Sequence, residues 1–151
     1  MRHAAVAALA GAGLLAAPAL SATPLLTKPG TIRITSTQVS ETLVDIGRHG
    51  ITPGDTQIIR DQLYNLRITR KPIGHAELVC TFTVGNSRYC SGTYFFPKGK
   101  IVVAGPIYFR QLYELAVSGG TGLYDNVRGS LTATMTHANP RREVLIFRLT
   151  V

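Results

Sequence analysis

The stretch from Gly129 to His137 constrains the fold most, because its side chains alternate almost without exception between two kinds. Leu131, Ala133, Met135 and His137 fall on one side, and a serine and three threonines fall on the other. A repeat of two residues with one mainly apolar side is typical of a β-strand that packs against a core on one face. We therefore expect a sheet with one buried face.

A glycine-rich segment, Ser118 to Gly129, precedes this strand and reads SGGTGLYDNVRG. Glycine accepts positive φ angles and close backbone contacts, so the segment predicts a tight corner between two strands. Neither of the glycine motifs of phosphate-binding loops occurs in it, and a strand follows where such a loop would open a helix. The sequence thus argues against nucleotide binding here.

The rest of the chain shows similar short extended stretches, separated by turns rich in glycine, proline and asparagine. The predicted strands cover residues 31–46, 56–66, 76–84, 89–96, 101–104, 108–117, 129–137 and 143–151. The segment 56–66 also fits an amphipathic helix, and the sequence leaves that choice open. Eight closely spaced strands predict an all-β antiparallel barrel or sandwich. We favour the barrel, because closure hides the sheet edges and can enclose one small ligand.

The first residues read as a targeting segment. A basic start is followed by an uninterrupted run of small and apolar residues from Ala4 to Ala17 and by small residues suited to cleavage, which predicts a signal peptide over residues 1–22. A retained N-terminal anchor is the alternative. A linker over residues 23–30 and one barrel domain over residues 31–151 complete the expected organisation. We expect a secreted or cell-envelope protein, with no stable membrane insertion.

The formal net charge of the chain is +8. The basic residues are scattered, with neighbours only at Arg70–Lys71 and Arg141–Arg142. A nucleic-acid binder more often gathers them on one face, so the pattern argues against a nucleic-acid partner.

Two cysteines, Cys80 and Cys90, flank a predicted hairpin turn at residues 85–87. An even pair in an oxidising compartment suggests a disulfide. A three-residue loop would place both on the same face of the hairpin, whereas a two- or four-residue loop would place them on opposite faces. Both outcomes stay open at this point.

Several motifs occur in an order that resembles the allene oxide cyclase and dirigent-like barrel family. They are Gly54-Asp55, Leu63-Tyr64, Gly74 with Cys80 six residues later, Gly99, Gly105 and LAVSGGTGLYDNVRG. The resemblance covers roughly residues 31–151. It implies an eight-stranded antiparallel β-barrel with a mostly apolar cavity, no cofactor, and a homo-oligomer, either dimer or trimer. In that family, plant cyclases steer ring closure of an unstable fatty-acid epoxide, and dirigent proteins orient radicals for stereoselective coupling.

The resemblance also implies site residues. The family's first-strand glutamate and the asparagine two residues later fall on Arg33 and Thr35, another asparagine falls on Asp61, and a tyrosine falls on Ile107. The barrel cysteine is kept as Cys80. On this alignment Arg33, Asp61 and Cys80 are the candidate catalytic residues.

The substituted positions imply a lumen with a charged pair. Arg33 would meet Asp61 or bind a substrate carboxylate, and Asp61 would act as a base if burial raised its pKa. The alternation of Ile32 and Ile34 as core residues predicts instead that Arg33 lies in solvent.

The remaining candidates are ligand-binding residues, which we take from polar and apolar positions expected to line the cavity. They are Thr35, Leu78, Phe82, Tyr94, Ile107 and Tyr108. For the aromatic ones, ordinary core packing is the alternative. No spacing of histidine, cysteine or acidic residues resembles a metal site. We expect a barrel that binds a hydrophobic small molecule and steers its cyclisation or isomerisation; non-catalytic ligand binding or an envelope structural role is the alternative.

Overall fold

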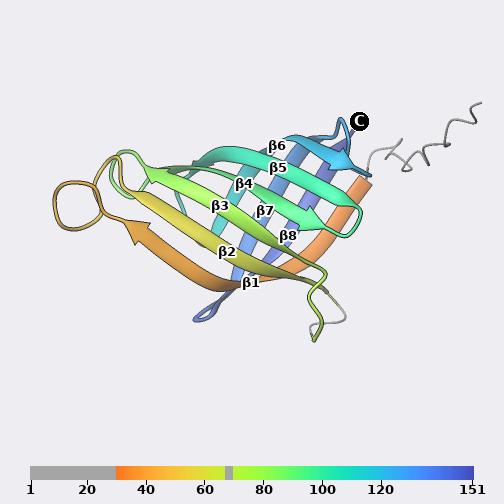
Figure 1. Cartoon of the computed structure of the whole chain (residues 1–151), viewed down its shortest axis with the longest axis horizontal. Coiled ribbons are helices and arrows are strands. Elements are labelled where there is room, and N and C mark those ends of the chain that lie inside the picture. The colour runs from red at the N-terminus through yellow and green to blue at the C-terminus, as the bar shows by residue number, and fades with distance from the viewer. Residues whose placement is uncertain (1–29, 67–69) are drawn as a thin grey trace, which may run out of the picture.

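The computed structural model describes residues 30–66 and 70–151, which form eight β-strands closed into one antiparallel barrel (Figure 1). The strands are β1 (Gly30–Val44), β2 (Thr56–Asn65), β3 (Gly74–Phe82), β4 (Arg88–Phe96), β5 (Gly99–Ile107), β6 (Leu112–Gly122), β7 (Arg128–Ala138) and β8 (Arg141–Thr150). Each strand pairs with the next, and β8 pairs with β1, so closure leaves the sheet without a free edge. The predicted eight-stranded barrel is confirmed. The predicted signal peptide and all of the linker except Gly30 lie outside the described residues.

The segment that also fitted a helix is a strand. β2 pairs with β1 on one side and β3 on the other, and its buried residues follow a period of two: Gln57, Asp61 and Leu63 are buried and Ile59 is partly buried. The helix alternative was wrong, because pairing with two neighbours outweighs local helix propensity.

The glycine-rich segment forms the predicted corner, and the chain turns between β6 and β7 there. Gly122 has a φ of 64°, in the left-handed region that favours glycine. Gly129 has a φ of 137°, and a Cβ atom placed on it would lie 1.9 Å from the carbonyl oxygen of Arg148 on β8. Both positions therefore require glycine for conformation and close approach.

Bulges correct the simple alternation in two places. On β7 the pairing with β8 shifts between Met135 and His137, so His137 is exposed and not on the packed face where the alternation placed it. On β1 the pairing with β2 shifts between Gln38 and Ser40, around Val39. As a result, Gln38 pairs with Asp61 and Glu41 pairs with Ile59, and both of these partners face inward on β2. Gln38 and Glu41 therefore both face inward, although residues three apart on a regular strand face opposite sides.

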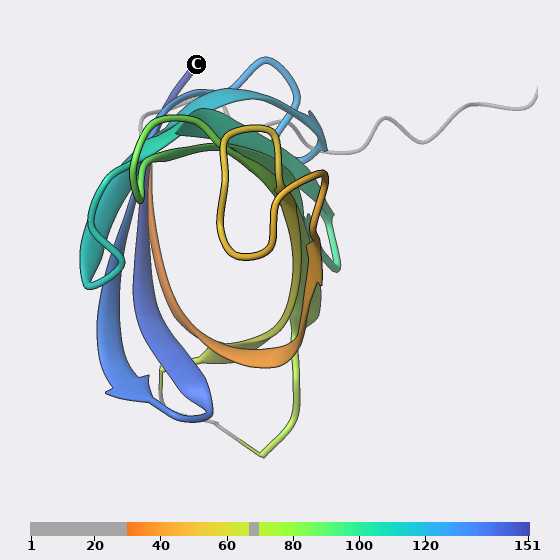
Figure 2. The same cartoon turned by 90° about the vertical axis from the view of Figure 1, so that its left-hand side faces the viewer.

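The two ends of the barrel differ. At one end, aromatic rings pack into the core, with Tyr94 edge-on to Phe147 at a centroid distance of 5.1 Å and Phe96 in contact with Phe147 and Tyr124. At the other end lie the four loops between β1 and β2, β3 and β4, β5 and β6, and β7 and β8. We call this end the mouth, and Figure 2 faces it, with the β1–β2 loop in front.

One carboxylate holds the β1–β2 loop of the mouth in place. Asp55 accepts hydrogen bonds from the backbone N–H groups of Ile46, at 2.8 Å, and Thr52, at 2.6 Å. These hydrogen bonds lower the pKa of Asp55, and the bond from Ile46 has the larger effect. The loop is thereby tied to the first residue before β2.

Cys80 and Cys90 form a disulfide. They are directly opposed on β3 and β4, and the loop between these strands, residues 83–87, has an odd number of residues, so both cysteines face inward. Of the two outcomes left open by the sequence, the shared face is the observed one. The described residues contain no helix long and apolar enough to cross a membrane.

Candidate functional site

Polar and charged side chains fill the half of the lumen nearest the mouth. Strand alternation and the β1 bulge bring most of them inward from five strands, and the β5–β6 loop adds one more. They are Gln38 and Glu41 of β1, Gln57 and Asp61 of β2, Arg88 of β4, Tyr113 of β6, Arg141 and Glu143 of β8, and Arg110 of the loop. The other half of the lumen is packed by apolar side chains.

Glu143 is the most tightly held carboxylate of this cluster. It is 3% exposed, and its Oε2 accepts a hydrogen bond of 2.8 Å from the Tyr113 hydroxyl. Arg141 donates from Nε to Oε1 at 2.7 Å and forms an ion pair with the same oxygen through Nη2 at 2.6 Å. The guanidinium therefore balances the charge of Glu143 and fixes its orientation.

Asp61 lies in the same part of the lumen and is 7% exposed. Burial, followed by repulsion from Glu143, raises the pKa of its carboxyl group to about 7, although Arg141 partly opposes the shift. A carboxyl group with this pKa is present in both protonation states near neutral pH. It can therefore give up or accept a proton under physiological conditions.

Two tyrosine hydroxyl groups complete the interior of the site. Burial raises the pKa of Tyr94 well above its ordinary value, and Glu143 and Asp61 add to the shift. Burial likewise raises the pKa of Tyr113, with Tyr94 and Glu143 contributing. Both phenols therefore stay neutral near neutral pH, and the Tyr113 hydroxyl is the hydrogen-bond donor to Glu143.

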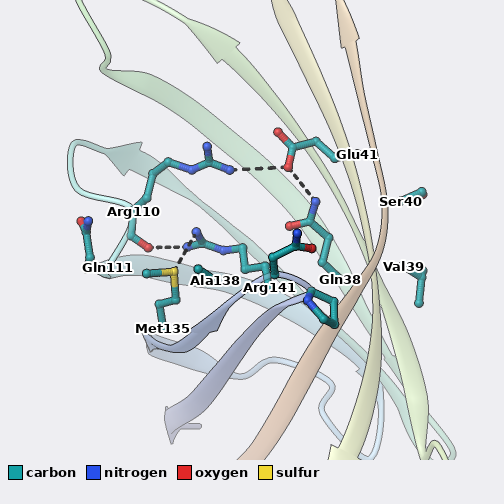
Figure 3. Close-up of a pocket in the computed structure, with 11 residues that line it drawn as sticks. Gln38, Val39, Ser40, Glu41, Arg110, Gln111, Met135, Ala138 and Arg141 are labelled. Atoms are coloured by element: carbon teal, nitrogen blue, oxygen red, sulfur yellow. Dashed lines mark hydrogen bonds and ion pairs between the residues drawn. The ribbon is translucent and has the colours of Figure 1, made fainter.

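A small void of about 20 Å³ lies beside Asp61, between Tyr113, Arg141 and Glu143, and it is large enough for one water molecule. Two of the larger pockets at the mouth share lining residues with this void. One, of about 530 Å³, lies between the β1 bulge and the β7–β8 hairpin (Figure 3). The other, of about 400 Å³, lies between the β1–β2 loop, the β3–β4 loop and the β5–β6 loop.

Arg110 lines the void and also these two mouth pockets. Its guanidinium reaches across the mouth to Glu41, at 3.5 Å, and its backbone carbonyl accepts a hydrogen bond from Arg141 (Figure 3). The Arg110 side chain is 51% exposed, so its contact with Glu41 holds it weakly.

Two predicted lumen residues lie elsewhere. Arg33 is exposed, and Thr35 is half-buried on the same outward side of β1, with its hydroxyl 3.5 Å from the carbonyl oxygen of Tyr64. Ile34 and Ser36 take the inward positions. The predicted Arg33–Asp61 pair in the lumen was therefore wrong, and the alternative that Arg33 lies in solvent is the observed one.

The other predicted site residues divide into three groups. Leu78, Cys80 and Ile107 line the void beside Asp61, but Cys80 is bound in the disulfide and is no free thiol. Phe82 and Tyr108 line the smaller mouth pocket. Tyr94 is in the aromatic core at the inner end of the site, in keeping with the packing alternative.

Sequence reasoning missed Glu143, Arg141 and Arg88. A signal for them was present: Glu143 is in step with the core residues Leu145 and Phe147 of β8, and Arg88 is in step with Cys90 of β4. A charged residue in step with an apolar series is an informative departure, because buried charge is costly and is kept where it has partners or a function. Within the described ranges, no group of three or more histidine, cysteine, aspartate or glutamate side chains is placed to hold a metal ion.

Comparison with known proteins supports the fold. By sequence, neither a protein-family model nor a curated protein matches the chain. Among solved structures, pyocyanin demethylase is similar with a TM-score of 0.70 and 25% identity, over 80% of this chain and 100% of that one. A pterocarpan synthase dirigent protein has a TM-score of 0.64 at 16% identity, over 81% of this chain and 83% of its own. The Diels–Alderase AbmU from Streptomyces koyangensis has a TM-score of 0.62 at 14% identity, over 82% and 70%.

The dirigent protein and the Diels–Alderase are similar to this chain in fold, and theirs is the barrel fold that the order of motifs in the sequence indicated. The chain therefore has the eight-stranded barrel fold of the allene oxide cyclase and dirigent-like proteins.

Proposed function

We propose that this barrel is an acid–base catalyst that isomerises or cyclises a hydrophobic, conjugated small molecule bound in the mouth half of its lumen. The observation that carries the proposal is the Asp61 carboxyl group, which is buried beside Glu143 and has a pKa of about 7. Perturbed carboxyl groups in a cleft are typical of proton-transfer sites.

The chemistry follows from the protonation states of the site. With Asp61 ionised, its carboxylate takes a proton from one position of the conjugated ligand and returns it to another. Arg141 and Tyr113 hold Glu143 in place, and its negative charge disfavours a second anion nearby. This repulsion helps to keep the pKa of Asp61 at about 7. The neutral phenol of Tyr94 lies deeper in the lumen, where apolar packing keeps bulk water out. No other reactant is required, because the proton leaves and returns within one molecule.

The structural neighbours support the class of ligand. Pyocyanin demethylase, by its name, acts on pyocyanin, a planar conjugated ring system, and is 25% identical over its whole length. The dirigent and Diels–Alderase barrels are similar in fold. The two mouth pockets, of about 530 and 400 Å³, are large enough to take a planar ring.

The test uses pyocyanin as the probe, in D₂O, with its visible absorption and the deuterium content of the product as readouts. We expect turnover that changes with pH around 7. Asp61→Asn should lower the rate by about a hundredfold or more while affinity changes little. Glu77→Gln is the matched control, since it removes an exposed carboxylate from the outer face of β3. Retention of the rate by Asp61→Asn would refute the proposal.

Non-catalytic binding is the second candidate, and one observation favours it: the void at Asp61 is far smaller than the mouth pockets. A ligand held at the mouth would not touch Asp61 unless Arg110 moved. In that case pyocyanin would bind without chemical change, and Asp61→Asn would affect only its dissociation constant.

We also propose that the protein works outside the cytoplasm and assembles as a dimer or trimer. The Cys80–Cys90 disulfide supports the first, because such bonds persist in oxidising compartments. The outward-facing Val144 and Ile146 of β8 support the second, since apolar side chains on an outer face suit a contact between subunits. Cell fractionation tests the location, and light scattering coupled to size exclusion measures the subunit number. A cytoplasmic protein with reduced cysteines would contradict the proposed location. A monomer in solution would contradict the proposed assembly.

A further inference from the structure

Three arginines meet at the mouth, and they are not equivalent. Arg110 forms an ion pair with Glu41 at 3.5 Å, and Arg141 forms one with Glu143 at 2.6 Å. Arg88, at the start of β4, forms no ion pair with Glu41 or Glu143. In the described part of the chain, no carboxylate lies within ion-pair distance of its guanidinium group.

Arg88 is 4% exposed, so its charge is largely removed from water. Its contacts are with neutral groups: Nη1 donates a hydrogen bond to Oε1 of Gln57, and the guanidinium carbon lies 5.9 Å from the centre of the Phe82 ring. The amide nitrogen of Gln57 donates in turn to Glu41, so Gln57 links Arg88 to this carboxylate through its amide group. A buried cation without a direct counter-ion is costly.

The groups around Arg88 add to the excess of positive charge. Burial lowers the pKa of Arg88, and repulsion from Arg110 and Arg141 lowers it further, while Glu41 opposes them only in part. The mouth also holds Asp61, whose pKa of about 7 leaves it partly neutral at physiological pH. An anion bound at Arg88 would relieve this excess of positive charge.

The pocket of about 400 Å³ lies directly at Arg88 and joins two kinds of surface. Arg88 and Gln57 are among the polar groups lining it, and Phe82, Leu43 and Ile51 among the apolar ones. The adjacent Tyr108 and Phe109, at its edge, are 64% and 74% exposed. Large exposed aromatic side chains around a pocket are typical of a surface that packs against a ligand ring.

We propose that this pocket binds a monoanionic aromatic carboxylate, with its carboxylate on the Arg88 guanidinium and its rings between Phe82 and the Tyr108–Phe109 edge. The proposal rests on the proposed function and gives the substrate class of the same lumen. The planar guanidinium group offers two parallel N–H donors that match the two oxygens of a carboxylate. A ring without an acid group, such as pyocyanin, would bind through the aromatic residues alone and more weakly, because it would leave the charge of Arg88 unbalanced. A small inorganic anion would gain no contact with the aromatic residues.

The position of Arg110 fits this arrangement. Arg110 lines the same pocket and also the void at Asp61. A carboxylate at Arg88 offers Arg110 a partner other than Glu41, so its side chain would turn from Glu41 towards the ligand. Binding of the acid group would thereby open the path from the mouth to Asp61.

The experiment compares naphthoate with naphthamide, which have the same rings and similar size but differ in charge, by calorimetric titration of the full barrel with its disulfide intact. We expect naphthoate to bind about tenfold or more tightly than naphthamide. Arg88→Gln should remove this preference, and Arg110→Gln should reduce it. Arg60→Gln is the control, because Arg60 is an exposed arginine on the outer face and its loss changes the net charge equally. Circular dichroism establishes that each variant is folded, and if Arg88→Gln does not fold, Arg110→Gln and competition by inorganic phosphate carry the test.

Each of three outcomes would overturn the proposal. Equal affinity for naphthoate and naphthamide would show that the pocket does not recognise the acid group. An equal loss of naphthoate affinity in Arg60→Gln would show that only the overall positive charge matters. Displacement of naphthoate by inorganic phosphate at similar concentration would show a site for small anions. Asp61→Asn should keep the naphthoate preference, so failure of the proposed proton transfer is distinguishable from failure of this inference.

Discussion

Replacement of Asp61 by asparagine should stabilise the barrel at alkaline pH and have little effect on its stability at acid pH. The reason is that the lumen favours the protonated carboxyl group, mainly through burial and then through the nearby Glu143. Asparagine resembles the protonated acid in size and shape and cannot ionise. The variant therefore avoids the cost that the native chain meets when Asp61 loses its proton.

The magnitude follows from the two pKa values. The pKa of Asp61 rises from 3.8 to about 7 on folding. Each unit corresponds to about 1.4 kcal/mol, so ionisation of Asp61 should lower the free energy of unfolding by about 4 kcal/mol at high pH. The native protein binds this proton more tightly than the unfolded chain. Its contribution is thus complete below the unfolded pKa of 3.8, falls as the pH rises, and is lost once the pH exceeds about 7.

Urea unfolding under non-reducing conditions measures this effect, at about pH 5 and about pH 8. The difference in unfolding free energy between Asp61→Asn and the native sequence should grow by about 2 to 3 kcal/mol between these two conditions. Asp45→Asn, in the exposed β1–β2 loop, is the matched control for removal of one negative charge.

Parallel pH profiles for Asp61→Asn and the native sequence would refute the reasoning, because they would mean that folding does not change the proton affinity of Asp61. An equal change in Asp45→Asn would assign the effect to net charge and not to burial. A fall in stability of Asp61→Asn at every pH would indicate that the carboxyl group has a structural partner that asparagine cannot replace.

Two further predictions concern the stability of the barrel around the site. Replacement of both Cys80 and Cys90 by serine should lower the unfolding free energy by roughly 2 to 3 kcal/mol, since the bond closes a loop with a sequence separation of 10; urea unfolding with and without reductant checks this, and reductant should leave the variant unchanged. Gly129→Ala should destabilise the barrel by roughly 1 to 3 kcal/mol or more, because its Cβ would lie 1.9 Å from a backbone oxygen of β8. Gly47→Ala is its control, since Gly47 also has a positive φ but nothing within 4 Å of an added Cβ, and thermal unfolding should rank the two; an equal loss would mean that backbone conformation alone decides.

Most of the strands and turns of the barrel could be predicted from local sequence patterns. The alternation on β7 up to Met135, the glycine corner and the eight strands are properties of neighbouring residues, and these predictions were confirmed. Local patterns were insufficient where pairing between strands intervenes. The bulge after Met135 moved His137 outward, against the prediction, and pairing with β1 and β3 decided between the strand predicted over residues 56–66 and the helix that the sequence left open.

The site was less accessible from the sequence. Asp61 was selected through the family resemblance and is indeed buried, but Arg33 was wrongly given as its partner. Glu143 is 82 residues further along the chain and reaches Asp61 because closure of the barrel places β8 and β2 on either side of β1. The β1 bulge adds Glu41 to the inward set, which strict alternation cannot do.

The sequence by itself thus determined that this chain forms short antiparallel strands with a tight glycine corner, since periodicity and glycine act over a few residues. Only the tertiary structure decided which charged groups share the lumen and which arginine stands at the mouth without a carboxylate. The pKa of a carboxyl group depends on its burial and on charges brought close by folding, and both arise from contacts between strands that are distant in the sequence. The chemistry of Asp61 and Arg88 is therefore a property of the closed barrel.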